Sequence, residues 1–208
     1  MSGFSRPSTA AVYPGTCFFE GTNVSEGRGT ERPFEYIGAP FIEGKKLAEH
    51  LNQQNLPGVI FEAIEFTPQD IPSVVTNPKH KGVRCRGVFV NVKERNVFEP
   101  VKTAVYMLAA IKSLYPNDFQ WRGSIDRLAA TPTLRLAIDT GVPPEKIVEM
   151  WKEEVEQSQG VNEQLVALLK LWKRQLFITT LHVAFSCISS HDSLCCFELL
   201  QHEGSDLI

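Results

Sequence analysis

The sequence is organised around the stretch Glu20-Gly-Thr-Asn-Val-Ser-Glu-Gly-Arg-Gly-Thr30, which is polar almost throughout. Its eleven residues carry two carboxylates, one guanidinium, one amide and three hydroxyls, and three glycines separate them. Such a run holds too little apolar surface for a core strand or a buried helix. It is either a free loop or the lining of a site that holds a polar ligand. Apolar flanks, Cys17-Phe18-Phe19 before it and Pro33 to Ile37 after it, favour an ordered loop pinned at both ends.

Hydrophobic periodicity on either side of this stretch predicts an α+β fold with a mixed sheet flanked by helices. Val88, Val90 and Val92 alternate with other residues and fall on one face of a strand, and Pro100 suits the first position of a helix. Strands and helices alternate without a strict βαβ rhythm or a glycine fingerprint, which favours α+β over a doubly wound sheet. The expected elements are a strand over 9–19 interrupted at Pro14-Gly15, a helix over 43–54, a strand over 59–66, a long loop over 67–82, a strand over 83–92, and helices over 100–114, 124–128, 133–138 and from 144.

The chain is expected to divide into a domain over residues 1–157 and an appended tail over 158–208 that is helical or partly disordered. The tail contains a leucine-rich helical pattern at 164–176, which also admits a role in binding a partner helix. The apolar run at 177–188 is shorter than the roughly 20 residues that span a membrane.

Composition excludes several classes of function. The net charge of −3 argues against a nucleic-acid-binding protein, and the basic cluster at 79–86 is interpreted as a solvated loop before a strand. The five cysteines show no metal-binding spacing, so reduced thiols are expected, with no metal and no cofactor. The N-terminus shows no export signal.

The residue types of the polar stretch fit carbohydrate chemistry better than phosphate binding. A P-loop needs four residues between its first glycine and a Gly-Lys pair, whereas five separate Gly21 from Gly27 and an arginine follows. Glycoside hydrolysis commonly uses two carboxyl groups, and a guanidinium binds a charged sugar substituent. The candidate residues are Glu20, Asn23, Ser25, Glu26 and Arg28. A structural loop could use the same groups to cap its own backbone, so the residues alone leave both interpretations open.

A longer signature extends from Tyr13-Pro-Gly-Thr-Cys17 through the polar stretch to Arg32-Pro-Phe-Glu35. Further motifs follow in order: Gly38-Ala39-Pro40, Phe66-Thr67-Pro68, Lys81-Gly82, Cys85-Arg86-Gly87-Val88, Phe98-Glu99-Pro100-Val101, Tyr115-Pro116, Ile125-Asp126-Arg127-Leu128 and Trp151. With these motifs, residues 11–157 resemble the C-terminal domain of the exo-β-N-acetylmuramidases of bacterial cell-wall recycling, a family formerly known as a domain of unknown function.

The resemblance implies one half of a two-domain glycosidase. Members of that family join a Rossmann-like N-terminal half to a smaller α/β half, and they remove terminal N-acetylmuramic acid from peptidoglycan fragments in the cleft between the halves. The principal proposed catalytic glutamate belongs to the first half, and this chain resembles only the second. We therefore expect one wall of the cleft, with a missing Rossmann-like domain as partner. Members are often extracytoplasmic, but the sequence assigns no compartment.

Roles for individual residues follow from the same resemblance. Arg28 or Arg32 would bind the lactyl carboxylate of the sugar, and Glu20 or Glu26 would serve as a second carboxylate, with Glu20 as the catalytic candidate. His80 either reaches the site or is a surface histidine. The alternative is an inactive fragment that binds sugar or a partner, because catalysis needs groups from both walls.

Two departures from the family pattern stand out. Ala130 occupies a position where the family tends to have glycine, and the tail from about Ser158 replaces the usual short C-terminal end.

Overall fold

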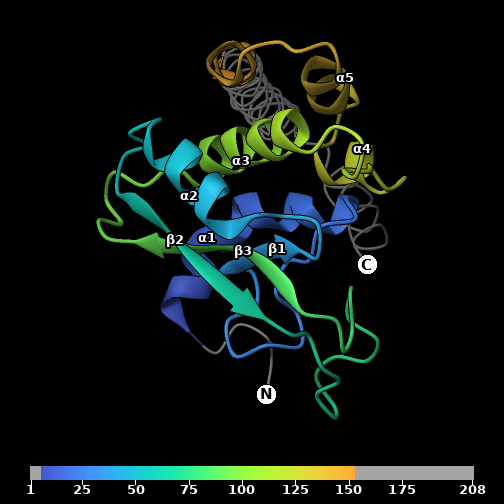
Figure 1. The fold of residues 1–208 in the computed structure, drawn as a ribbon. Coiled ribbons are helices and arrows are strands. Elements are labelled where there is room, and N and C mark those ends of the chain that lie inside the picture. Colours follow the sequence, from blue (N-terminus) through green and yellow to red (C-terminus); the bar gives the residue numbers. More distant parts are fainter. Residues whose placement is uncertain (1–5, 153–208) are drawn as a thin grey trace, which may run out of the picture. The chain divides into compact units, whose positions relative to one another are not determined.

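The computed structural model describes residues 6–152, so the expectations for the tail fall outside the described residues. The elements in chain order are α1 (Pro7–Thr16), the 3-10 helix η1 (Cys17–Gly21), β1 (Tyr36–Ala39), α2 (Gly44–Asn52), β2 (Val59–Phe66), β3 (Cys85–Val92), α3 (Pro100–Leu114), α4 (Ile125–Leu128) and α5 (Thr133–Asp139) (Figure 1). A further helix occupies residues 144–152. Of the described residues, 6–151 group into one compact unit, whereas the boundary expected at residue 157 stays a prediction.

The expected α+β class is confirmed, but the described sheet is antiparallel rather than mixed. The three described strands lie in the order β1-β3-β2, and both pairs are antiparallel. In the sequence, β1 and β2 are connected by α2, and the two strands point in the same direction in the sheet. They do not pair with each other, because β3 lies between them and runs antiparallel to both.

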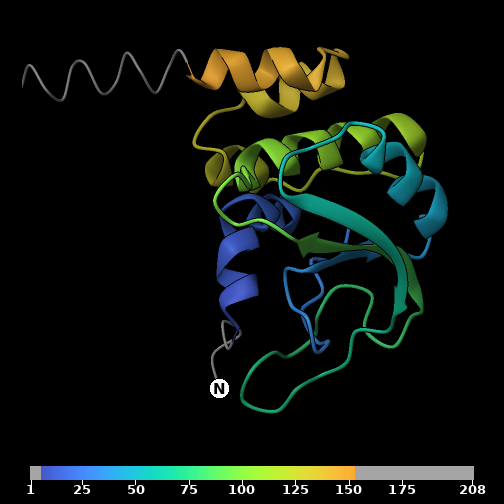
Figure 2. The ribbon, with the colours of Figure 1, turned by 90° about the vertical axis from the view of Figure 1, so that its left-hand side faces the viewer.

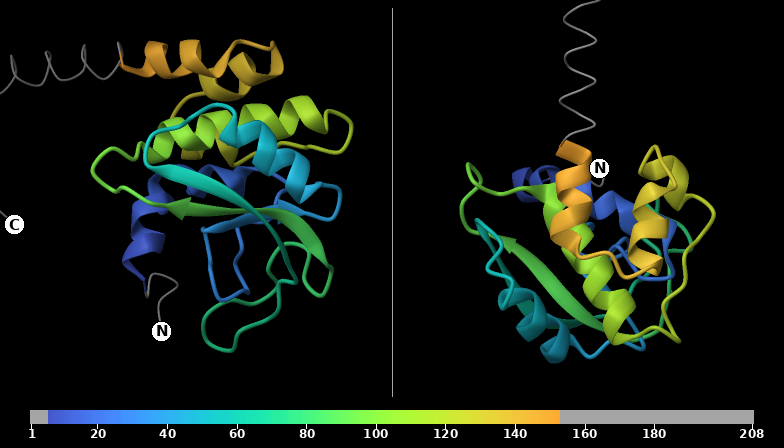
Figure 3. Two further views of the ribbon diagram at one scale, coloured as in Figure 1. Left: turned by 60° about the vertical axis from the view of Figure 1, so that its left-hand side comes forward. Right: turned by 90° about the horizontal axis from the view of Figure 1, so that it is seen from above.

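Helices cover one face of the sheet (Figure 2), whereas Ile60 of β2 is 45% exposed. Helix α2 packs on β2 and β3, and α3 packs on α1 and α2. The polar loop, defined as residues 20–30, runs from η1 past the edge of β1, and the long loop, defined as residues 67–84, joins β2 to β3 (Figure 3). The strand register places Ile37, Val88 and Val90 on the helical side, where all three are buried.

The core forms where the predicted apolar stripes meet. Leu47 and Leu51 of α2 are fully buried, as are Leu108 and Ile111 of α3. Ile147, from the helix at 144–152, is buried as well. Burying each such side chain contributes about 1.5–3 kcal/mol before conformational entropy is subtracted.

The strand expected over residues 9–19 is wrong: this segment forms α1 and η1. Its apolar and aromatic residues suggested a strand, and Pro14-Gly15 suggested a break in it. In the structure Pro14 lies inside α1, although an internal proline costs about 3 kcal/mol. Packing outweighs this cost, because Val12 is buried and Gly15 sits directly against the backbone of α3. A Cβ at Gly15 would lie 2.0 Å from the carbonyl oxygen of Pro100, so only glycine permits the approach.

The departure from the family pattern at Ala130 coincides with a strained backbone. Ala130 follows α4 and has φ of 58°, in the left-handed region that glycine adopts without penalty. A side chain with Cβ costs about 1–2 kcal/mol in this region.

Replacing Ala130 by glycine should therefore stabilise the domain. We expect Ala130→Gly to raise the free energy of unfolding by up to about 1 kcal/mol, since the relief of strain exceeds the added entropy of the unfolded chain. The neighbouring Ala129 has φ of −82°, so Ala129→Gly is the matched control and should lower stability by about 0.5–1 kcal/mol. Urea unfolding measures both; an equal loss of stability in the two variants would contradict strain at Ala130.

Candidate functional site

The polar loop is ordered and mostly buried, despite its composition. Thr22 and Ser25 are almost completely buried, and the backbone groups of Ser25 exchange hydrogen bonds of 2.8 and 3.1 Å with those of Gly38 in β1. The Ser25 hydroxyl accepts a bond of 3.2 Å from the backbone N–H of Gly27. The loop thus continues the sheet beyond β1, and the Ser25 side chain supports the loop's own backbone.

Asn23 ties the polar loop to the segment that follows α3. Its side-chain amide donates to the carbonyl of Asp118 at 2.8 Å, and its Oδ1 accepts from the backbone N–H of Gln120 at 2.9 Å. Its backbone carbonyl accepts from Nε2 of His80 at 2.7 Å. The side chains of Asn23 and Ser25 therefore fit the structural interpretation that the sequence left open.

Four side chains of alternating charge form a chain from the interior to the surface. The Lys79 ammonium pairs with Oε2 of Glu26 at 2.8 Å, and Oε1 of Glu26 lies 3.7 Å from Nε of Arg28. The Arg28 guanidinium then pairs with Oε1 of Glu20 at 3.3 Å. We call Lys79, Glu26, Arg28 and Glu20 the charge relay. Its inner members are buried, whereas the side chains of Arg28 and Glu20 are 43% and 31% exposed.

The Arg28 guanidinium also packs against an aromatic ring. Its Cζ lies 5.2 Å from the centroid of the Phe34 ring, a cation–π distance. The Nε of Arg28 is buried and makes no hydrogen bond to any residue within 6–152. This buried nitrogen lies 3.7 Å from Oε1 of Glu26, so the exposed part of the Arg28 side chain lies elsewhere.

Lys79 is the member that the sequence analysis missed. The cluster at 79–86 was interpreted as a solvated loop, yet the Lys79 side chain is only 9% exposed. Its ammonium also donates to the carbonyls of Phe19 at 2.6 Å and Val24 at 3.1 Å. Burial, assisted by the nearby Arg122, lowers the pKa of Lys79, and Glu26 and Glu20 oppose that shift. Within a Lys-His-Lys run no local signal distinguishes an inward lysine from an exposed one.

Arg32 belongs to a separate cluster at the far end of the loop. It donates to Oε2 of Glu35 at 3.1 Å, and the Glu35 side chain is buried. The other oxygen of Glu35 accepts hydrogen bonds from Ser8 at 3.1 Å and Thr9 at 2.7 Å. Arg32 thereby neutralises a buried carboxylate that fastens the chain to the start of α1. The structure brings together Glu20, Glu26 and Arg28 and places Arg32 apart from them.

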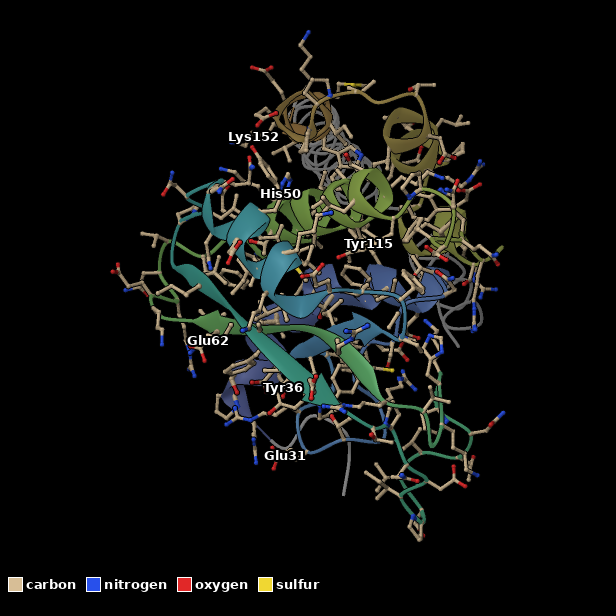
Figure 4. The ribbon with its side chains drawn as sticks, viewed as in Figure 1. Glu31, Tyr36, His50, Glu62, Tyr115 and Lys152 are labelled. Atoms are coloured by element: carbon tan, nitrogen blue, oxygen red, sulfur yellow. The ribbon has the colours of Figure 1, made fainter. Side chains whose placement is uncertain are left out.

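A separate pocket lies on the helical side. It has a volume of about 440 Å³ between α2, α3 and α5, and its lining includes His50, Lys112 and Asp139. His50 projects from the helical layer, whereas Tyr36 and Glu31 lie on the opposite side of the sheet (Figure 4). None of the predicted site residues lines this pocket.

No group of His, Cys, Asp and Glu side chains within residues 6–152 could hold a metal ion. None of the helices in this part of the chain is long and apolar enough to cross a membrane. Cys17 and Cys85 are free thiols, and burial raises the pKa of Cys85 to about 11.

Comparisons with known proteins agree with the sequence motifs. The family model described as the C-terminal part of exo-beta-N-acetylmuramidase NamZ matches residues 11–166, which ends within the expected tail. The peptidoglycan beta-N-acetylmuramidase NamZ of Bacillus subtilis is 45% identical over 148 residues. That alignment covers 70% of this chain and 34% of the relative, so the chain spans about a third of the relative's length.

Solved structures show the same fold. A crystal structure of a DUF1343 family protein from Bacteroides fragilis superimposes with a TM-score of 0.65 at 23% identity, over 74% of this chain and 41% of that one. A second DUF1343 protein from the same organism gives a TM-score of 0.57 at 28% identity, over 74% and 39% of the two chains. Fold, motifs and family match coincide over the polar loop and the sheet, and the chain therefore belongs to the NamZ family as its C-terminal domain.

Proposed function

We propose that this domain forms one wall of a site that binds the terminal N-acetylmuramic acid of peptidoglycan fragments. The observation that carries the proposal is the Arg28 guanidinium, whose side chain is 43% exposed at the outer end of the charge relay and which contacts Glu20 through one nitrogen. The Bacillus subtilis relative is a peptidoglycan beta-N-acetylmuramidase, which supports the choice of sugar. Because the chain spans only 34% of that relative, the proposal assigns the opposite wall to another domain.

Arg28, rather than Arg32, is the proposed ligand of the lactyl carboxylate. Arg32 neutralises the buried Glu35, and withdrawing it would leave that carboxylate without its cation. Arg28 instead contacts Glu20 at 3.3 Å through a single guanidinium nitrogen. A sugar carboxylate could take the place of the Glu20 oxygen and use two donors of the guanidinium, a bidentate geometry that Arg favours.

Glu20, rather than Glu26, is the proposed carboxylate that touches the sugar. Glu26 is buried between Lys79 and Arg28. Glu20 lies at the surface end of the relay, and the ligand carboxylate would release it from Arg28 toward the sugar hydroxyls. The proposal gives Glu26 a supporting role and leaves His80, bonded to the Asn23 carbonyl, at the margin of the site.

This single wall should not catalyse hydrolysis. The rate enhancement of a glycosidase depends on groups held in register around the scissile bond, and the proposal places only part of them here. The alternative function, a sugar-binding or partner-binding fragment, follows from the same argument.

Arg28 should discriminate muramic acid from its uncharged analogue. We expect Arg28→Gln to weaken binding of N-acetylmuramic acid about 10-fold or more, because a charge-assisted bond contributes about 1.5–3 kcal/mol. Binding of N-acetylglucosamine, which lacks the lactyl carboxylate, should change little. Titration calorimetry measures both sugars. Arg84→Gln removes an arginine whose side chain is 72% exposed and serves as the matched control. Equal affinity of Arg28→Gln and the unaltered chain for N-acetylmuramic acid would refute the assignment.

The isolated chain should release no sugar from a chromogenic N-acetylmuramide above the uncatalysed rate. The assay needs a parallel thermal unfolding curve, so that inactivity is measured on folded protein. Release that disappears in Glu20→Gln would show that this domain is catalytic by itself, and the one-wall proposal would then be wrong.

A further inference from the structure

Lys79 lies where the long loop meets the polar loop. Its ammonium donates hydrogen bonds to the carbonyls of Phe19 and Val24 and forms an ion pair with Oε2 of Glu26. The same two loops also join through the backbone N–H of Gln69, which donates to the carbonyl of Gly29 at 2.9 Å. The Lys79 ammonium is therefore held in the interior by three oxygens, and its side chain is only 9% exposed.

The two cations around Glu26 contribute unequally to its neutralisation. Lys79 contacts Glu26 at 2.8 Å and is almost completely buried. Arg28 lies 3.7 Å from the other oxygen of Glu26 and remains 43% exposed. A buried carboxylate needs a close cation, and a pair loses much of its stability when one partner is removed. As long as Lys79 supplies that charge, Arg28 does not need to turn inward.

We propose that Lys79 is a positioning residue that keeps Arg28 available to a ligand by neutralising Glu26 from the interior. This inference rests on the proposed function, since it concerns the same guanidinium. Without the ammonium, the gap of 3.7 Å between Arg28 and Glu26 closes, because Arg28 is then the nearest cation to a buried charge. Arg28 withdraws from the surface and from Glu20, and its capacity to bind an external carboxylate falls.

The inference makes a prediction that a purely structural role does not make. Lys79→Met should weaken binding of N-acetylmuramic acid about 10-fold, although Lys79 does not touch the ligand in this arrangement. The double variant Lys79→Met/Glu26→Gln removes both buried charges, so Arg28 is free again and affinity should return to within about threefold of the unaltered chain. Lys81→Met, in the same loop with a side chain 46% exposed, is the matched control and should bind normally.

A readout without sugar separates this inference from the proposed function. Phenylglyoxal modifies accessible guanidinium groups, and peptide mass spectrometry reports the modification of Arg28. We expect its rate to fall severalfold in Lys79→Met, to recover in the double variant, and to rise in Glu26→Gln. An unchanged modification rate of Arg28 in Lys79→Met, or no rise in Glu26→Gln, would overturn the positioning role. If Lys79→Met does not fold, the rate in Glu26→Gln decides. Failure of the unaltered chain to prefer N-acetylmuramic acid over N-acetylglucosamine would instead overturn the proposed function alone.

Discussion

The ion pair between Lys79 and Glu26 is the interaction on which the candidate site depends. Both side chains are almost completely removed from solvent, and each comes from a loop rather than from the sheet or a helix. Desolvation of two charges is expensive, and it is offset only by close contacts such as those the ammonium makes with Glu26 and two backbone carbonyls. The pair thus fixes two loops relative to each other, which loops rarely achieve through apolar contacts alone.

This constraint explains why a segment so rich in polar groups is buried. Most of its side chains are used within the protein: Ser25 caps backbone, Asn23 binds the segment after α3, and Glu26 pairs with Lys79. Only Glu20 and Arg28 remain substantially exposed as an ion pair at the surface. The structural interpretation of the segment therefore holds for Asn23, Ser25 and Glu26, whereas the functional interpretation stays a prediction for Glu20 and Arg28.

Elements with a strong period could be predicted from the sequence, and elements fixed by tertiary contacts could not. The helices at Gly44–Asn52 and Pro100–Leu114 and the strand at Val59–Phe66 agree closely with their apolar patterns. Helix α1 was mistaken for a strand because its proline and glycine are tolerated only through packing on α3. The short strand β1 was missed, since four residues carry too little periodicity. The inward direction of Lys79 depends on Glu26, more than fifty positions earlier, and no local pattern encodes it.

The insertion of β3 between β1 and β2 has a consequence for how the chain acquires its structure during synthesis. When β1 and β2 leave the ribosome, neither has its hydrogen-bonding neighbour, because the central strand follows only after the long loop. The backbone N–H and C=O groups on these edges are then unpaired, and unpaired strand edges promote association between nascent chains. Until Val92 has emerged, the order of translation thus leaves the first half of this domain without its central strand.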